Sequence, residues 1–261
     1  LQGSRSNSSN TSSPAPIIYH PDVKRMLLDM KCIAEAGRCL TLYAAYCIDL
    51  SKRHADAATR QIFSERLSLL TPVVKAWITD RAIECASTGI QVHGGLGYIE
   101  DAGAAQHLRD ARIMAIYEGT NGIQALDLTG RKVVRDGGRT LKELLLVLAD
   151  FEVDAKYESD VSEAFDRLRK VTDSMIARSN EDANLPGALS TDYLDLVGMT
   201  LCAWAWGVMA HHAKDDDFGV AKKQTARFFF ARLLPRTLGL EQGLTAGSDV
   251  VMEMPEALFN A

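Results

Sequence analysis

Long stretches of this 261-residue chain repeat apolar residues at steps of three and four, the spacing of one face of an α-helix. The first stretch begins near Pro21, which suits the first helical position because it has no N–H to leave unpaired there, and reaches about Lys52. Its apolar stripe consists of Val23, Met26, Leu27, Met30, Ile33, Ala34, Gly37, Leu40 and Ala44. No stretch alternates apolar and polar residues as a half-buried strand does. The sequence therefore predicts an all-α fold.

Further helices follow in the first half of the chain. A second long amphipathic helix is expected to carry Pro72 near its beginning and to end at Gly89 or soon after. The glycine-rich run GGLGY, from Gly94 to Tyr98, interrupts helical periodicity. Two shorter helices are expected after it, at about 106–113 and 121–134.

The run Asp136-Gly137-Gly138 marks a boundary between two helical units. We expect one domain over residues 1–138, led by a flexible loop over 1–19, and an additional C-terminal helical domain over 139–261. Thr140 and Glu143 have the spacing of a capping box, in which each side chain bonds the other's backbone N–H. The helices of this second unit are expected at about 141–151, 161–178, 191–213 and 218–234.

The charge pattern argues against two classes of partner. Net charge is −5 and no basic block stands out, which disfavours binding to nucleic acid or to an anionic membrane surface. The longest uncharged run, from Leu196 to Ala213, has the length at which a membrane span becomes conceivable. Polar and glycine residues interrupt it, and Asp195 and Lys214 close it. We interpret it as a buried helix.

The cysteines and histidines do not predict a metal site. No Cys-x-x-Cys occurs, so the thiols are interpreted as small hydrophobic residues of a reduced, cytoplasmic protein. His211 and His212 are adjacent, so on a helix they point about 100° apart and are poorly placed to share a metal ion. The five cysteines are Cys32, Cys39, Cys47, Cys85 and Cys202.

The chemically informative stretch runs from residue 91 to 131. Glu118 lies in a loop next to Gly119, and the following helix is expected to begin at Thr120 or Asn121, with its N–H groups facing any nearby anion. Gly94 opens a second loop without side-chain obstruction. The run GGLGY is not a dinucleotide-binding fingerprint, because it follows a helix and Glu100 stands where the last glycine of that motif belongs.

Three runs in this stretch resemble the C-terminal signature of the acyl-CoA dehydrogenase family: QVHGGLGYIED, RDARI and IYEGTNGIQ. The run HPDVKRMLLDM resembles the second helix of the family's C-terminal four-helix domain. Beyond residue 141 the chain resembles the extra helical domain of the longer members. The resemblance covers essentially the whole chain. It implies the family's C-terminal helical bundle, with the first helix missing, followed by a second helical unit.

The resemblance also implies an activity: α,β-dehydrogenation of an acyl-CoA thioester, with FAD accepting the β-hydrogen as hydride. The family's usual base is the glutamate of the YEGT motif, here Glu118. An α-C–H is a weak acid, so the thioester oxygen must receive hydrogen bonds as enolate character develops. In the family the base's own backbone N–H supplies one of them. Gly119 allows the acyl chain and the flavin to pack closely.

Cofactor contacts and assembly are implied in the same way. Gln91, Gly94 and Gly95 resemble the segment that contacts FAD bound to a neighbouring subunit. Such cross-subunit contacts imply a homodimer or homotetramer, with an electron-transfer flavoprotein as electron acceptor. The other FAD-contacting stretch is Thr120, Asn121 and Gly122.

The chain also departs from the family pattern. The N-terminal helical domain and the central β domain are absent, so we expect a chain that begins partway through a longer protein, is inactive alone and binds FAD weakly. Two alternatives stay open: a non-catalytic helical module for oligomerisation or interaction, and an acyl-CoA oxidase. For side chains outside the motif glutamate, the structural interpretation is preferred. His93 is expected in a local hydrogen bond, with contact to a cofactor phosphate left open. Arg109-Asp110 is expected in an ion pair between two helices, and Trp204 and Trp206 in packing.

Overall fold

The computed structural model describes residues 15–260, and every regular element within them is a helix, which confirms the all-α prediction. The predicted leading loop lies mostly outside the described residues. The elements of the first half are η1 (Ile17–Tyr19), α1 (Pro21–Arg53), α2 (Ala57–Pro72), η2 (Val73–Trp77), α3 (Ile78–His93), α4 (Gly95–Tyr98), η3 (Glu100–Ala102), α5 (Ala104–Met114), α6 (Asn121–Leu126) and η4 (Asp127–Val134).

The second half continues in the same manner. Its elements are α7 (Arg139–Ala149), α8 (Glu158–Arg178), α9 (Leu185–Ala188), α10 (Ser190–His211), α11 (Asp217–Phe228), η5 (Phe229–Leu233), α12 (Arg236–Gly243), α13 (Asp249–Met252) and η6 (Glu256–Asn260). Helices α7, α8 and α10 begin and end within three residues of the predicted positions. The helix predicted over 218–234 is divided between α11 and the π turn η5.

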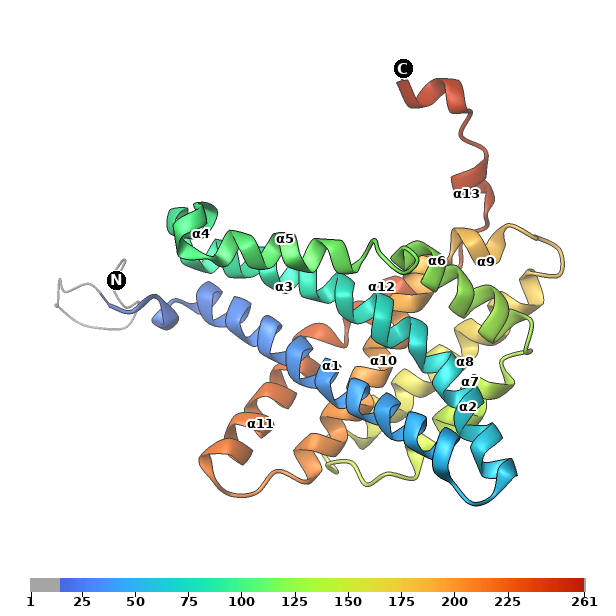
Figure 1. Cartoon of the computed structure of the whole chain (residues 1–261), viewed down its shortest axis with the longest axis horizontal. Coiled ribbons are helices and arrows are strands. Elements are labelled where there is room, and N and C mark those ends of the chain that lie inside the picture. Colours follow the sequence, from blue (N-terminus) through green and yellow to red (C-terminus); the bar gives the residue numbers. More distant parts are fainter. Residues whose placement is uncertain (1–14, 261) are drawn as a thin grey trace.

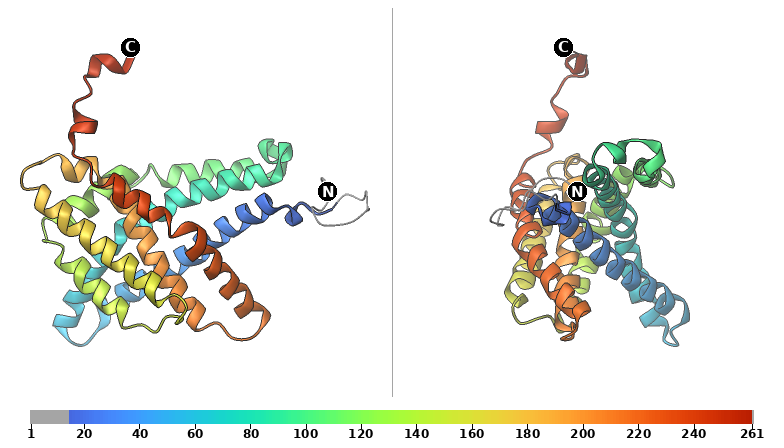
Figure 2. Two further views of the ribbon diagram at one scale, coloured as in Figure 1. Left: turned by 180° about the vertical axis from the view of Figure 1, so that it is seen from behind. Right: turned by 90° about the vertical axis from the view of Figure 1, so that its left-hand side faces the viewer.

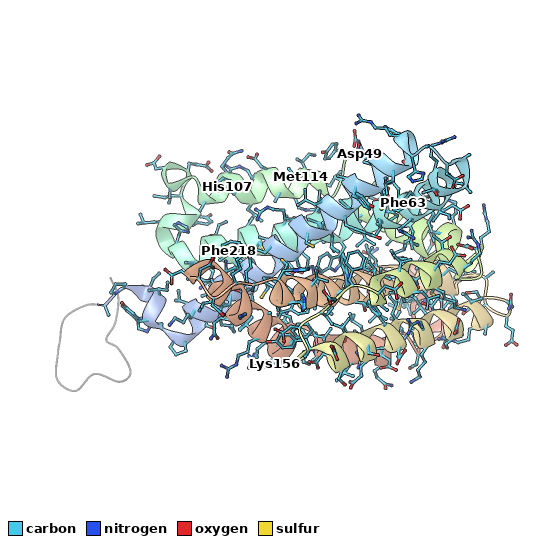
Figure 3. The ribbon with its side chains drawn as sticks, turned by 90° about the horizontal axis from the view of Figure 1, so that it is seen from below. Asp49, Phe63, His107, Met114, Lys156 and Phe218 are labelled. Carbon is cyan, nitrogen blue, oxygen red and sulfur yellow. The ribbon has the colours of Figure 1, made fainter. Side chains whose placement is uncertain are left out.

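Helix α10 forms the centre of the molecule. Figure 3 shows α5, which carries His107 and Met114, on one side of the molecule and the yellow helix α8 on the other, with α1 running diagonally between them. Helix α10 contacts α1, α6, α8, α11 and α12. Among the described residues it is the one helix long and apolar enough to cross a membrane, and 83% of its most apolar window is buried inside the fold. It is thus the buried helix that its sequence predicts.

The second long helix differs from its prediction around Pro72. Pro72 closes the 16-residue helix α2 and does not lie near a helix beginning. The chain continues without a loop through a π-helical turn, Val73–Trp77, into α3. Proline has no N–H to donate to the preceding turn, and such an interruption is a common cause of a wider turn. The π turn changes which side chains face the rest of the bundle.

Helices α3 and α5 form an arm that stands out from the bundle, with α4 at its tip (Figures 1 and 2). Although α3 is 16 residues long, none of its residues is buried. Gly97 keeps the tip compact, because a Cβ there would lie 2.5 Å from the carbonyl oxygen of Ile90. The arm meets the bundle at α6, so the loop at the base of the arm, between α5 and α6, lies next to these two helices and α3.

Two further features of the second half concern its ends. The predicted capping box does not form: Thr140 is already inside α7, and its N–H donates to the Asp136 carboxylate at 3.0 Å. Gly138, with φ of 73°, precedes the helix. At the other end, α13 and η6 extend away from the bundle (Figure 2), and all residues from 249 to 260 are exposed.

Candidate active site

The loop between α5 and α6 holds Glu118 in an uncommon conformation. Glu118 has φ of 54° and is the one non-glycine residue with positive φ in the described part of the chain; Gly119 follows with φ of 88°. The left-handed region costs a residue with a side chain about 1–2 kcal/mol, so it persists only where the surroundings impose it. Two such residues in succession turn the chain sharply at the base of the arm. Backbone strain of this kind concentrates at functional sites.

Polar backbone groups of this loop are left open. The N–H groups of Glu118 and Gly119 have no partner within residues 15–260, whereas the Asn121 N–H donates to the Ala115 carbonyl at 3.0 Å. Thr120 caps α6 by accepting from the Ile123 N–H at 3.4 Å. The N–H groups of Asn121 and Ile123 are thus engaged, so fewer donors are open at the helix start than its sequence predicts, whereas those of Glu118 and Gly119 stay free.

An apolar surface surrounds Glu118. The Glu118 residue itself is exposed. Exposed apolar groups that cluster in this way mark a surface made to be covered by a ligand or another part of a protein. Met114 marks its α5 side in Figure 3. The surface consists of Ile113, Met114, Ile116, Tyr117, Ile123 and Leu126.

A polar network, not predicted from the sequence, lies beneath the loop, with the buried Asn121 at its centre. The Lys75 ammonium, from the π turn, donates to the Gly119 carbonyl at 2.7 Å and to Asn121 Oδ1 at 2.9 Å. Asn121 is buried, so its side chain faces the helices and not a ligand. Its Nδ2 donates to the Ala76 carbonyl at 3.0 Å, to Thr79 Oγ1 at 2.9 Å and to Asp80 Oδ1 at 2.7 Å. One signal was available: Lys75 is the single charged residue between Arg66 and Asp80.

The second predicted group lies at the far end of the arm. Gln91 and Gly94 sit where α3 ends, Gly94 has φ of 64°, and Gly95 begins α4. All three are exposed, and a Cβ on either glycine would meet no atom within 4 Å. Helix α5, 11 residues and about 16 Å long, separates this tip from the Glu118 loop. One chain therefore presents the two loops as separate surfaces.

The structural interpretations of several other side chains agree with the geometry. The His93 ring lies in a local hydrogen bond with the Gly89 carbonyl, at 2.7 Å. Arg109 forms an ion pair, but with Glu100 and not with Asp110. Both terminal nitrogens of its guanidinium donate to the Glu100 carboxylate, and the distance from Nη1 to Oε1 is 2.9 Å. This pair ties η3 to α5.

The interpretation of the tryptophans as packing residues also agrees with the structure. All five cysteines are free. Trp204 and Trp206 are buried in the core. No group of three metal-ligating side chains occurs among residues 15–260.

Comparison with known proteins places the chain in a family. Residues 5–132 match the model described as "Acyl-CoA dehydrogenase, C-terminal domain". Residues 147–255 match the model described as "Acetyl-CoA dehydrogenase C-terminal like". The chain belongs to the acyl-CoA dehydrogenase family and corresponds to its C-terminal region. The helical architecture is that of this region.

Individual relatives agree with this assignment. The chain is 38% identical to a 3-methylmercaptopropionyl-CoA dehydrogenase of Ruegeria pomeroyi over 88% of its own length. It is 30% identical to a butyryl-CoA dehydrogenase of Syntrophomonas wolfei over 92% of its length. In both cases it spans 42% of the relative. The crystal structure of ACDH-11 of Caenorhabditis elegans in complex with C11-CoA has the same fold, with a TM-score of 0.60, 21% identity, and coverage of 82% of this chain and 36% of that one.

Proposed function

We propose that this chain supplies the catalytic base of an FAD-dependent acyl-CoA dehydrogenase, and that Glu118 removes the α-proton of the thioester. Family membership supports the reaction class. The observation that carries the residue assignment is the left-handed conformation of Glu118, beside two unpaired N–H groups and within an exposed apolar surface. A base, an oxyanion donor and an apolar wall are the three things that α-proton abstraction from a thioester requires.

The chemistry divides between the side chain and the backbone of the same residue. The Glu118 carboxylate takes the α-proton, and its free N–H is available to the thioester oxygen as negative charge develops there. Gly119 contributes no side chain, so the acyl chain and the flavin can approach the backbone closely. In the chain as described, Glu118 is exposed, so the water-poor pocket that strengthens a base must be completed by parts beyond this chain.

FAD, when bound, accepts the β-hydrogen as hydride. The glycine tip fits a large cofactor, because Gly94 and Gly95 leave open space where side chains would stand. At the other loop, Thr120 and Gly122 are exposed, whereas the side chain of Asn121 is engaged within the fold. We therefore assign the polar contacts of this stretch with FAD to Thr120 and Gly122, since the side chain and the N–H of Asn121 are both engaged within the fold.

We infer that the two loops serve different copies of the chain. Because α5 separates them, Gln91 and the glycine tip are placed to contact FAD held by a neighbouring subunit, in a homodimer or homotetramer. An electron-transfer flavoprotein is the proposed electron acceptor, and the five free thiols fit a reducing, cytoplasmic compartment. An oxidase differs from this proposal only in its acceptor.

The test uses the longest natural protein that contains this sequence, under anaerobic conditions. Bound flavin should bleach with at least one ester of a panel that includes butyryl-CoA and 3-methylmercaptopropionyl-CoA. Glu118→Gln should keep the flavin and abolish bleaching, because an amide cannot accept the proton. Glu181→Gln, at an exposed glutamate far along the chain, is the matched control.

Three results would count against the proposal. Bleaching of Glu118→Gln at the wild-type rate would place the base elsewhere. Absence of flavin in the wild-type protein would favour the non-catalytic helical module. Rapid reoxidation of the reduced flavin by O2 would favour the oxidase. The chain alone is expected to show no activity and weak FAD binding, measurable by titration.

A further inference from the structure

We propose that Lys75 is a positioning residue for Glu118: its ammonium group holds the Gly119 carbonyl and thereby fixes the peptide that follows the base. This inference rests on the proposed function and names a residue that the motif itself does not contain. Lys75 lies 43 positions before Glu118 in the sequence and reaches the loop from η2, which packs against α6.

The loop requires such a restraint. Glu118 and Gly119 both have positive φ, and the chain on either side offers little to hold them. The contact from Gln124 Nε2 to the Glu118 carbonyl is 3.5 Å long, at the limit of a hydrogen bond. The bond from Lys75 to Gly119 is 2.7 Å long and carries a full charge on the donor, which makes it the strongest tether at this turn.

Local sequence explains how a lysine comes to stand there. Pro72 ends α2, and the π turn that follows begins at Val73 and carries Lys75. A π turn holds more residues per turn than an α-helix, so it shifts the side chains after it around the axis; such turns occur often at functional sites. Lys75 faces the loop as a result, and Ala76 of the same turn offers its carbonyl to Asn121.

Asn121 makes the lysine part of a rigid assembly. Its Oδ1 accepts from Lys75 at 2.9 Å. The two hydrogens of its Nδ2 are shared among three acceptors of η2, which carries Lys75, and of α3, which follows η2 without a break. The ammonium is therefore anchored at one end of α6 and bonded to the loop just before it. Because Asn121 is buried, water competes little for the hydrogen bonds of its side chain, and these bonds hold the lysine in place beside the more exposed Gly119 carbonyl. Movement of Lys75 would release the Gly119 carbonyl and let the Glu118 turn relax.

A displaced base predicts a particular kinetic defect. In the longest natural protein, Lys75→Met should slow flavin bleaching at saturating acyl-CoA by about 10- to 100-fold, since misplacement by about 1 Å has costs of this order. Flavin content and the acyl-CoA concentration for half-maximal rate should stay near wild type. Lys75→Arg, which keeps a charged donor, should recover most of the rate. If Lys75 only stabilised the fold, Lys75→Met would lower the flavin content and the bleaching rate together.

The matched control is Lys132→Met. Lys132 also bridges two helical segments, donating to Ser68 Oγ at 2.6 Å, but it does not touch the loop. It should leave the bleaching rate within about twofold of wild type. In the chain alone, hydrogen exchange of the peptide covering 116–122 should accelerate in Lys75→Met and not in Lys132→Met.

The outcomes separate this inference from the proposed function. A wild-type protein that bleaches, with Glu118→Gln inactive and Lys75→Met unimpaired, overturns the role of Lys75 alone. Failure of the wild-type protein to bleach overturns the proposed function, and hydrogen exchange then still reports on the tether: unchanged exchange at 116–122 in Lys75→Met refutes it. Should Lys75→Met not fold, Lys75→Gln takes its place under the same criteria, because glutamine is shorter than lysine and carries no charge.

Discussion

The indole ring of Trp77 packs directly on the backbone of Gly198: a Cβ added at Gly198 would lie 2.4 Å from the indole atoms Cγ and Cδ2. Trp77 is almost fully buried, and its Nε1 donates to Asp195 Oδ1 at 2.7 Å. This contact joins the π turn of the first half to the central helix of the second. The position of Lys75, two residues away, depends on the same turn.

Gly198→Ala is expected to lower the free energy of unfolding by about 1–3 kcal/mol, because no atom of the rigid indole or the helix can yield by the required distance. Chemical denaturation of the chain measures this change. Gly239→Ala is the control, since a Cβ there meets no atom within 4 Å and alanine is the better helix former. It should be stabilising by about 0.5–1 kcal/mol. Equal effects of the two substitutions would contradict the packing described.

Glu118→Gly should stabilise the chain by about 0.5–1 kcal/mol while removing the proposed base, since glycine adopts positive φ without steric cost but loses more freedom on folding. Gly119→Ala should act in the opposite sense, lowering the free energy of unfolding by about 1–2 kcal/mol. Thermal unfolding of both variants tests the pair. If Glu118→Gly were destabilised instead, the glutamate side chain would stabilise the fold, and its strained backbone would not be evidence of a functional role.

We expect acid to weaken the contact between α1 and α11, because this contact includes an ion pair between Glu35, only 14% exposed, and Lys222. Burial raises the pKa of Glu35, but hydrogen bonds from Lys222, at 2.8 Å, and from Lys31 outweigh burial and hold the pKa below its ordinary 4.5. A lowered pKa means that the folded chain binds fewer protons than the unfolded one. The stabilisation is therefore complete above pH 4.5 and is lost as pH falls through the lowered value.

Glu35→Gln should thus cost about 1–3 kcal/mol at neutral pH, where it leaves Lys222 without its charged partner. The difference from wild type should shrink as the pH falls below 4.5. Urea denaturation at a series of pH values measures both. A difference that does not depend on pH would mean that packing, and not charge, links the two helices.

The cysteines should resist modification while the chain is folded. Burial raises the pKa of Cys85 to about 11 and also raises those of Cys39 and Cys47. Because the thiolate is the reactive form, labelling with a thiol reagent at neutral pH should be slow and should accelerate on unfolding, when all five react. A rapid labelling phase in the native chain would point to an activated thiol that the structure does not contain.

Much of the fold could be predicted because helices are encoded locally. Apolar steps of three and four located α1, which ends one residue beyond Lys52, and the long helices of the second half. The motif likewise predicted that Glu118 lies in a loop between two helices. The division into domains 1–138 and 139–261 stays a prediction, since α10 packs against elements of both halves.

What failed was local reasoning about residues whose partners come from elsewhere. Thr140 and Glu143 have the spacing of a capping box, but Asp136 bonds the Thr140 N–H instead. Glu35 lies outside the apolar stripe of α1, yet Lys222 of α11 covers it. Neither partner can be found from the spacing of residues within one helix.

The amino-acid sequence by itself determined the helices, the family and the glutamate that the proposed reaction needs, because periodicity and motif depend on neighbours along the chain. Only the tertiary structure decided how that glutamate is held. Lys75 and Asn121, 46 positions apart, meet beneath it because the π turn η2 packs against the start of α6. Hydrogen bonds over such separations depend on how helices pack, and no local pattern specifies them.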